Sequence, residues 1–492
     1  MLKDISKREG LHVEMKDARG GLPKSIWSTY SAFANTDGGV IYLGVTEEAD
    51  GKLVTIGVDD PESMIKTFWD IINNPSKVNA NILTDSDVRT LTSDEKQVIA
   101  ITVPRAERRQ KPIFINGNPL NGTFRRNGEG DYRCTQDEYK GMLRDSGAEP
   151  LDATLVENAR MESLCKETIS FYRRLLKTAR PNHSWIALAD DELLMRLGAA
   201  GRQPGESELK PTRAGLLMFG YEYEIVKEFP DYFLDYREVR SDIRWDDRVV
   251  TNDGEWSGNL LDFWGKIAPK LADDLKRPFF LDIGTTTVAA GMQRVEDAPM
   301  FKAVREALAN MLVHADYFGQ RYSIIIKKED KIEFSNPGGL RIPSDIAMEG
   351  GLSDSRNPTI MKMFGLLNLC EKAGSGFSAI RQACEQSELP YPELKEAFNP
   401  DRTTLILYTQ NLEKREGGHK SFALKKFPSA TTEEEKVLAL IEKEGRIRRT
   451  DVEELLDIGS TKAKYLLASM IEEGLVVVEG VGRGTKYRLA ED

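Results

Sequence analysis

The sequence contains little cysteine, little histidine and no long apolar run. Its 492 residues include four cysteines and four histidines. The cysteines, at positions 134, 165, 370 and 384, form no C-x-x-C pair, which argues against a zinc ribbon and a disulfide framework. No stretch approaches the roughly 18 apolar residues of a membrane helix, and the first residues lack the apolar segment of a secretory signal. We therefore expect a cytoplasmic protein that does not interact with a membrane.

The sequence also lacks a basic excess. Asp and Glu total 79 against 68 Lys and Arg, and the formal net charge is −11. Proteins that bind nucleic acid usually carry an excess of positive charge, so such binding would depend on local clusters. Basic clusters occur at residues 105–126, at 414–426 and in the C-terminal part. Ordinary solvated surface explains each cluster equally well.

Length and composition indicate several folded domains. With 40% hydrophobic and 30% charged residues, the chain is typical of folded proteins, and 492 residues exceed what one core holds. We predict an α+β multidomain protein. The expected parts are an α/β domain at 1–148, a mixed α/β connector with a possible role in oligomerisation at 149–296, an α/β domain at 297–410, a polar linker at 411–430 and a small unit at 431–492.

Apolar periodicity predicts the main elements. The expected helices cover residues 25–35, 135–144, 164–176, 189–197 and 299–314. The expected strands cover residues 40–45, 98–103, 232–239, 322–327 and 331–334.

Acidic residues and a lysine stand close together near the N-terminus. Glu9 and Glu14 are followed by Lys16, and Glu47 lies about thirty residues further along. In a strand, Glu14 and Lys16 would share a face. Clustered carboxylates can hold a divalent cation that activates water against a phosphodiester, and a lysine can stabilise the charge that develops. A solvated acidic surface explains the same spacing.

Three motifs in this region resemble the Schlafen/AlbA-like family. They are the E-x-x-x-x-E-x-K element at 9–16, the sequence Ser-Ala-Phe-Ala-Asn-Thr-Asp-Gly-Gly at 31–39, and Ile-Tyr-Leu-Gly-Val at 41–45. The resemblance extends over residues 5–145. It implies a nucleic-acid-binding or nuclease domain, with Arg126 in its closing portion as a nucleic-acid contact. The sequence around Asn35 is also typical of a tight connection from a helix to a strand.

The resemblance further implies a metal-dependent site that cleaves RNA. Its metal ligands would be Glu9, Glu14 and Glu47, holding Mg²⁺ or Mn²⁺, with Lys16 beside them. Glu47 stands where the family usually has aspartate, and Thr46 replaces the preceding aspartate. Since Schlafen nucleases pair two such domains around RNA, one domain per chain implies a homo-oligomer, at least a dimer.

A second set of motifs lies between residues 305 and 377. Glu306 and Asn310 are four residues apart on one face of an expected helix. Downstream come Asn-Pro-Gly-Gly at 336–339, Ser-Arg-Asn-Pro at 355–358 and Gly-Ser-Gly at 374–376. At each of these breaks the backbone N–H groups could face phosphate oxygens.

The order of these motifs resembles the Bergerat (GHKL-type) ATP-binding fold, in the family likened to a RecG C-terminus. No P-loop motif is present, so helicase activity does not follow. The resemblance implies an α/β sandwich that binds ATP and Mg²⁺. Its implied roles are a general base at Glu306, a Mg²⁺ ligand at Asn310, an adenine contact at Asn336, a phosphate contact at Arg356, and close backbone approaches at Gly338, Gly374 and Gly376.

The last 62 residues are similar to the winged helix-turn-helix family. Three expected helices are followed by two short strands around a glycine-rich turn. The residues expected to meet nucleic acid are Arg449, Lys462, Lys464 and Arg483. A winged helix that docks on protein is the alternative. Tyr465 is expected to face inward.

Two functions are consistent with this sequence. The first is an enzyme: an ATP-regulated, metal-dependent nuclease of Schlafen type, with RNA as the favoured substrate. It would serve bacterial defence or stress response. ATP hydrolysis is expected in addition to nucleic-acid cleavage or in place of it. The second is an ATP-responsive, DNA-binding transcriptional regulator without nuclease activity. Metal-dependent cleavage would distinguish them.

Overall fold

The computed structural model describes most of the chain. The described residues are 10–47, 53–239, 246–272, 299–370, 376–398, 401–410, 434, 437–438, 440–441, 446–456, 458–472, 475–479 and 485–489. The chain divides into two compact units, Met1–Thr409 and Gln410–Asp492. Within the described ranges, no helix combines the length and apolar character needed to cross a membrane.

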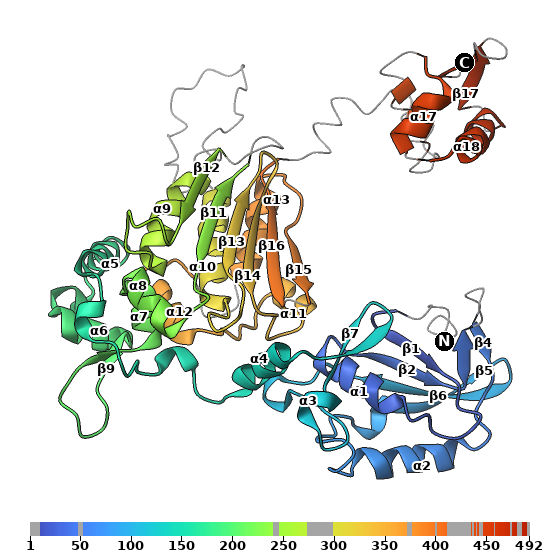
Figure 1. Ribbon diagram of the computed structural model, residues 1–492, viewed down its shortest axis with the longest axis horizontal. Helices are drawn as coiled ribbons and strands as arrows, with labels where there is room; N and C mark the ends of the chain where they lie inside the picture. Colours follow the sequence, from blue (N-terminus) through green and yellow to red (C-terminus); the bar gives the residue numbers. More distant parts are fainter. Residues whose placement is uncertain are drawn as a thin grey trace. The chain divides into compact units, whose positions relative to one another are not determined.

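A four-stranded sheet forms the centre of the N-terminal domain (Figure 1). Its order is β1 (Val13–Lys16), β2 (Gly39–Leu43), β6 (Lys96–Val103) and β5 (Val88–Ser93). β1 and β2 are parallel, and the other neighbours are antiparallel. One core joins this sheet to α1 (Ile26–Asn35) and α2 (Pro61–Ile72).

Two hairpins and two helices complete this domain. They are β3 (Val45–Glu47) with β4 (Leu53–Thr55), β7 (Phe124–Asn127) with β8 (Gly130–Arg133), α3 (Pro119–Gly122) and α4 (Gln136–Ser146). α4 begins with a capping box, in which Thr135 and Glu138 each accept a hydrogen bond from the other's backbone N–H. The predicted helices at 25–35 and 135–144 are confirmed, with ends shifted by one or two residues.

The segment expected as a connector is mainly helical. Its elements are α5 (Lys166–Ala179), α6 (Asp190–Leu197), β9 (Ala200–Gly201), β10 (Lys210–Pro211), α7 (Arg213–Phe219), α8 (Glu222–Glu228), β11 (Leu234–Glu238), β12 (Asp247–Val250) and α9 (Leu260–Ala272). The first turn of α6 contains three acidic residues and its C-cap, Gly198, is left-handed, so both ends carry the sequence signals of a helix end.

The largest sheet has six strands. Its order is β12, β11, β13 (Ser323–Lys327), β14 (Lys331–Pro337), β16 (Arg402–Tyr408) and β15 (Glu393–Ala397). β11 and β13 are parallel, and all other neighbours are antiparallel. The same part of the chain forms four helices, namely α10 (Pro299–His314), α11 (Ser344–Glu349), α12 (Pro358–Leu366) and α13 (Gly376–Gln386). α10 contacts α9, α13 and β14.

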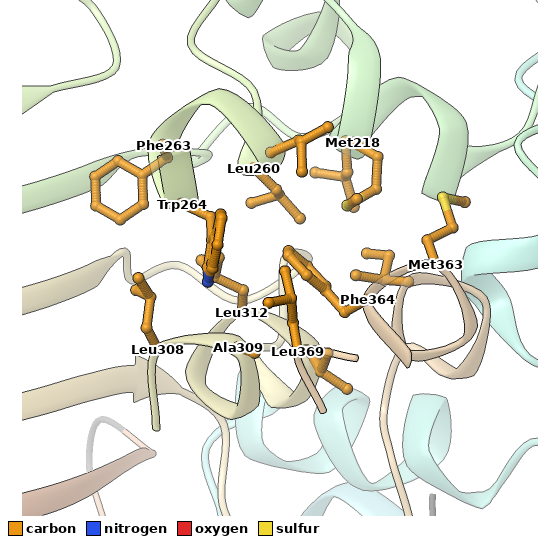
Figure 2. Packing of buried hydrophobic residues seen from close by; sticks show 14 of the residues in the cluster. Met218, Leu260, Phe263, Trp264, Leu308, Ala309, Leu312, Met363, Phe364 and Leu369 are labelled. Carbon is orange, nitrogen blue, oxygen red and sulfur yellow. The ribbon is translucent and has the colours of Figure 1, made fainter. Parts of the chain in front are cut away.

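The connector shares both a sheet and a core with the residues that follow it. β11 and β12 belong to the six-stranded sheet, so the expected boundary near residue 296 runs through this sheet. One hydrophobic cluster extends from Val156 to Leu407. Figure 2 shows Trp264 of α9, Leu308 of α10 and Phe364 of α12 among its members. The sequence did not predict that the connector shares a sheet with the residues after it, because β11 and β13, which pair in parallel, are about ninety residues apart.

The C-terminal unit has its own small core. Its described elements are α17 (Arg449–Leu456), α18 (Ser460–Glu472), β17 (Val476–Glu479) and β18 (Lys486–Leu489), and the two strands form an antiparallel hairpin. Leu467 and Met470 of α18 are buried in that core. The expectation that Tyr465 faces inward is wrong, because this side chain is 74% exposed.

The shared core predicts joint unfolding of the connector and the six-stranded sheet. Phe364 is fully buried, so Phe364→Ala should cost about 3–5 kcal/mol through lost contacts and a cavity. Urea unfolding, monitored by far-UV circular dichroism, should show a single transition for both parts, with its midpoint at a lower urea concentration than in the natural protein. Tyr223→Ala, at a side chain 58% exposed, should change stability by less than about 0.5 kcal/mol. Separate transitions for the two parts would contradict a common core.

Candidate functional site

Helix α10 presents two polar side chains at its surface. One face of the helix is buried in the large core, including Val304, Leu308 and Leu312. Glu306 and Asn310, four residues apart, are only partly buried and line the same cavity. The helical spacing predicted this shared face, and the predicted helix at 299–314 has the bounds of α10.

The cavity brings together motifs that are far apart in the sequence. Its volume is about 150 Å³. Polar side chains of the wall come from α10, from β14 and β16, from the loop after β14 and from the loop before α12, and Gly376 at the start of α13 completes the wall. These polar residues are Glu306, Asn310, His314, Asn336, Arg341, Ser353, Asp354, Arg356 and Thr403. Phe334, Leu405 and Met361 are among the apolar wall residues. An apolar cavity with a few convergent polar groups is typical of a small-molecule site.

Two of the predicted glycines stand at close approaches. A Cβ atom at Gly376 would lie 2.4 Å from Glu306 Oε1 and 3.1 Å from Asn310 Nδ2. A side chain at the start of α13 would therefore displace the carboxylate of Glu306 from its present position. Gly338 has a φ of +93°, and a Cβ atom there would lie 2.6 Å from Arg356 Nη1. Gly338 thus makes room for Arg356, and Gly374 lies outside the described residues.

Arg356 contacts both the cavity wall and the N-terminal domain. Its Nη1 donates to the backbone oxygen of His314 at 2.7 Å, and its Nη2 donates to that of Gly339 at 3.0 Å. Its Nε and Nη2 also bind the two carboxylate oxygens of Asp145, at 3.0 and 2.8 Å. Burial alone would raise the pKa of Asp145, but Arg356 and Arg341 hold it below its ordinary value.

The imidazole of His314 is kept neutral. Burial, followed by the nearby charges of Arg356 and Arg341, lowers the pKa of His314 to about 4. At neutral pH the ring therefore offers the cavity one donor and one acceptor but no charge.

In the N-terminal domain, Glu14 is already paired with two cations. Lys16 Nζ donates to Glu14 Oε1, which confirms that both side chains share one face of β1. Arg126 Nη2 lies 2.6 Å from Glu14 Oε2. Because Glu14 and Arg126 are both buried, this carboxylate is neutralised by protein cations. Glu14 in this arrangement is not a free ligand for a divalent ion.

The other expected metal ligands are not described in full. Glu9 lies outside the described residues. The backbone of Glu47 ends β3, which lies next to β1, while its side chain is outside the description. Among the described residues, no three His, Cys, Asp or Glu side chains are grouped so that they could hold a metal ion. The three-carboxylate site therefore stays a prediction.

The expected nucleic-acid contact at Arg126 is not available in this structure. Its side chain is 1% exposed and lies over the ring of Phe33. It donates to the backbone oxygen of Gly10 at 2.8 Å and to Asp131 at 2.9 Å. This guanidinium therefore holds β1 to the β7–β8 hairpin. The spacing of basic residues could not reveal its burial, because burial depends on the fold around it.

Other cations of the 105–126 cluster pair with residues of the following domain. Arg105 pairs with Asp37 and donates to the backbone oxygen of Leu340 at 2.5 Å. Arg108 pairs with Asp354 at 2.5 Å, and Arg125 pairs with Asp401. These three side chains are at most 21% exposed. Much of the cluster thus stabilises contacts within the first unit.

The expected tight connection from helix to strand is confirmed, because α1 ends at Asn35, Gly38 has a φ of +76° and β2 begins at Gly39. The buried amide of Asn35 has a further structural role. Asn35 accepts a hydrogen bond from the backbone N–H of Ile113 at 2.9 Å. It also donates to the backbone oxygens of Ile113 and Phe124, at 2.8 and 3.0 Å. These bonds join α1 to the chain that enters β7.

In the C-terminal unit, the expected contacts lie on two helices. Arg449 begins α17 and pairs with Glu453 at 2.9 Å, and its side chain is 46% exposed. Lys462 and Lys464 lie on α18 and are exposed, as is Tyr465. Arg483 lies outside the described residues. An exposed helix with lysines is compatible with contacts to phosphate.

Sequence reasoning missed several residues of the cavity region. Asp145, Arg341, Asp354 and Thr403 belong to no motif that the sequence makes visible. Asp145 comes from the last turn of α4, more than two hundred residues before Arg356. Only the contact between the domains reveals its place.

Three family models match parts of this chain. Residues 9–135 match the family "Schlafen, AlbA_2", and residues 320–407 match "Putative ATP-dependent DNA helicase recG C-terminal". Residues 140–235 match a domain of unknown function, DUF8451. No curated protein matches the chain. The expected Schlafen/AlbA-type N-terminal domain and RecG C-terminal-type domain are confirmed, and the chain is a mixed α/β multidomain protein.

Two solved structures are distantly similar to the chain. The DIP2311 protein from Corynebacterium diphtheriae is 18% identical, with a TM-score of 0.39, over 97% of this chain and 92% of that one. The N-terminal domain of a RecG-related protein from Nitrosomonas europaea, titled a putative ATP-dependent DNA helicase, is 27% identical with a TM-score of 0.21. That match covers 27% of this chain and 88% of the solved domain.

The depressed pKa of His314 predicts a pH-dependent stability. The unfolded state binds this proton near pH 6.5 and the folded state only near pH 4, so stability should fall as pH drops through that window. His314→Gln should therefore lose less thermal stability than the natural protein between pH 7.5 and pH 5. Melting temperatures at both pH values measure the difference. Equal losses in the two proteins would refute this assignment.

Proposed function

We propose that this protein binds ATP in the cavity beside α10 and uses ATP binding to control its action on nucleic acid. The observation that carries the proposal is the shared cavity of Glu306, Asn310, Asn336 and Gly376. These residues belong to three separate motifs of the ATP-binding resemblance. The match of residues 320–407 to a RecG C-terminal family supports the same conclusion.

The cavity residues fit ATP with a magnesium ion. The amide oxygen of Asn310 is the kind of ligand that Mg²⁺ prefers, and Glu306 on the same helix face would orient a water molecule as general base. Asn336, only 7% exposed, would hydrogen-bond the base between apolar walls such as Phe334 and Leu405. Bound Mg²⁺ would neutralise phosphate charge.

The Bergerat (GHKL-type) fold and the winged helix are parts of this proposal. A six-stranded mixed sheet, with α10 packed on it and α13 packed on α10, supports the first. Two helices followed by a hairpin in the small unit support the second. In this interpretation the ATP-binding domain includes β11 and β12, so it begins before the expected residue 297.

For the action on nucleic acid, the geometry favours the regulator over the nuclease. Glu14 is buried between Lys16 and Arg126, so a cation at this carboxylate would compete with two protein cations. Exposed Lys462 and Lys464 on α18 support DNA binding through the C-terminal unit. The protein would act as an ATP-responsive DNA-binding regulator in the cytoplasm.

ATP binding is tested by calorimetry with and without Mg²⁺. Asn310→Ala should weaken ATP binding at least about tenfold, because a metal ligand is lost, and should reduce the dependence on Mg²⁺. Glu306→Gln should keep ATP binding but abolish any slow hydrolysis, which a phosphate-release assay measures. Tyr223→Ala, at an exposed residue outside this cavity, is the control. Equal affinity of the Asn310→Ala variant and the natural protein would contradict the proposed site.

A cleavage assay separates the regulator from the nuclease. We expect no Mn²⁺- or Mg²⁺-dependent cleavage of structured RNA or single-stranded DNA, with ATP or without it. Lys462→Ala with Lys464→Ala should weaken binding to duplex DNA and reduce its dependence on salt, because phosphate contacts are lost. Cleavage that disappears in Glu14→Gln, in a variant that still folds, would favour the nuclease.

The pairing of Glu14 also predicts a structural effect. Glu14→Gln leaves buried Arg126 with less negative charge around it and should lower the stability of the N-terminal domain by about 3–5 kcal/mol. Urea unfolding measures this loss. Asp17→Asn, at an exposed residue close by, is the matched control. An equal, small effect of both substitutions would show that the buried pair contributes nothing.

A further inference from the structure

The last turn of α4 places a carboxylate against the wall of the nucleotide cavity. Asp145 belongs to the N-terminal domain, and its two oxygens accept hydrogen bonds from Nε and Nη2 of Arg356. Arg356 is one of the residues that line the cavity with Glu306 and Asn310. A bidentate contact between a guanidinium and a carboxylate is among the stronger hydrogen-bonded pairs in proteins.

The hydrogen-bonding capacity of Arg356 is almost fully used. A guanidinium has five N–H groups. Nε binds Asp145, Nη2 binds Asp145 and the backbone oxygen of Gly339, and Nη1 binds the backbone oxygen of His314. These contacts account for four of the five N–H groups. A phosphate can therefore receive two hydrogen bonds from Arg356 only if an existing partner leaves.

Asp145 is the partner that a phosphate would displace. The other two acceptors, on His314 and Gly339, are uncharged backbone oxygens of the same wall. Asp145 is an anion, so it competes with a phosphate for the same positive charge. Its charge is smaller than that of a di- or triphosphate, and it comes from another domain.

A second arginine couples the same helix end to the cavity. Arg341 Nη2 donates to the backbone oxygen of Asp145 at 3.0 Å, and its Nη1 donates to that of Ser355 at 2.7 Å. Arg341 also lines the cavity. Two cavity arginines therefore depend on where the end of α4 lies.

We propose that Asp145 is a determinant of nucleotide affinity, and that it competes with the phosphate groups of the bound nucleotide for Arg356. The proposal rests on the function proposed above. Nucleotide with phosphate groups loosens the contact of α4 with Arg356, and the closed contact in turn lowers affinity for phosphate. This reciprocity follows from linkage between the two interactions. It gives the N-terminal domain a direct means of sensing the nucleotide.

The experiment compares ligands with and without phosphate. Calorimetry is done on the full chain with ATP, ADP and adenosine in the presence of Mg²⁺. Asp145→Asn should tighten ATP binding at least about fivefold, within the usual range of coupling between sites, and should leave adenosine binding unchanged. A role of Asp145 in folding alone would change adenosine binding as well. Asp145→Glu, which keeps the carboxylate, should bind ATP about as weakly as the natural protein and more weakly than Asp145→Asn.

Asp137→Asn is the matched control. Asp137 lies on the same helix, in its exposed first turn, so the substitution changes net charge equally without touching Arg356. It should leave the affinities for ATP and adenosine as they are in the natural protein. Tighter ATP binding in this variant as well would show that general charge, and not the contact with Arg356, sets the affinity.

Hydrogen exchange on the natural protein gives an independent test. ATP should increase amide exchange in the last turn of α4, around residues 143–147, and adenosine should not. Unchanged or weaker ATP binding in Asp145→Asn, or protection of this turn by ATP, would overturn the competition while ATP binding stands. Failure of the natural protein to bind either ATP or adenosine would instead refute the proposed function.

Discussion

The burial of one face of α10 determines most of what surrounds it. Leucine, valine and alanine side chains of this helix are enclosed by α9, α13 and the six-stranded sheet. Because that face is fixed in the core, the rotation of the helix is fixed too, and Glu306 and Asn310 come to line the cavity. The same core includes the connector, so the cavity depends on helices that carry no functional motif.

Charge pairing is the second constraint on this molecule. The chain is acidic overall, yet the arginines at 105, 108, 125, 126, 341 and 356 are all paired with carboxylates or backbone oxygens. Buried or half-buried guanidinium groups need such partners, because an unpaired buried charge is costly. Arg105, Arg108 and Arg125, which look like a nucleic-acid surface in the sequence, therefore hold the N-terminal domain to the RecG C-terminal-type domain, whereas Arg126 holds elements of the N-terminal domain together. Glu14, the one expected metal ligand of the N-terminal domain whose side chain is described, is neutralised in the same way.

The local elements were predictable because their signals are local. The helix at 299–314 was predicted with its observed bounds, and the strands at 98–103, 322–327 and 331–334 agree with β6, β13 and β14 within a few residues. Periodicity of apolar residues decides such elements within a short stretch of chain. Strand geometry alone placed Glu14 and Lys16 on one face, although the ion pair between them was not predicted. Tyr465 was misplaced, since a short amphipathic helix leaves the edge of its apolar face undefined.

The sequence by itself determined the Schlafen/AlbA-type and RecG C-terminal-type domains, the positions of the main helices and strands, and the motifs that meet at the cavity. Only the tertiary structure decided that the connector and the RecG C-terminal-type domain share a core, that Arg126 is buried and that Asp145 binds Arg356. The physical reason is the range of the interactions. Hydrogen bonds within helices and apolar periodicity act over a few residues. Strand pairing, burial and ion pairing join residues that are tens to hundreds of positions apart, and they become defined only when the chain has packed.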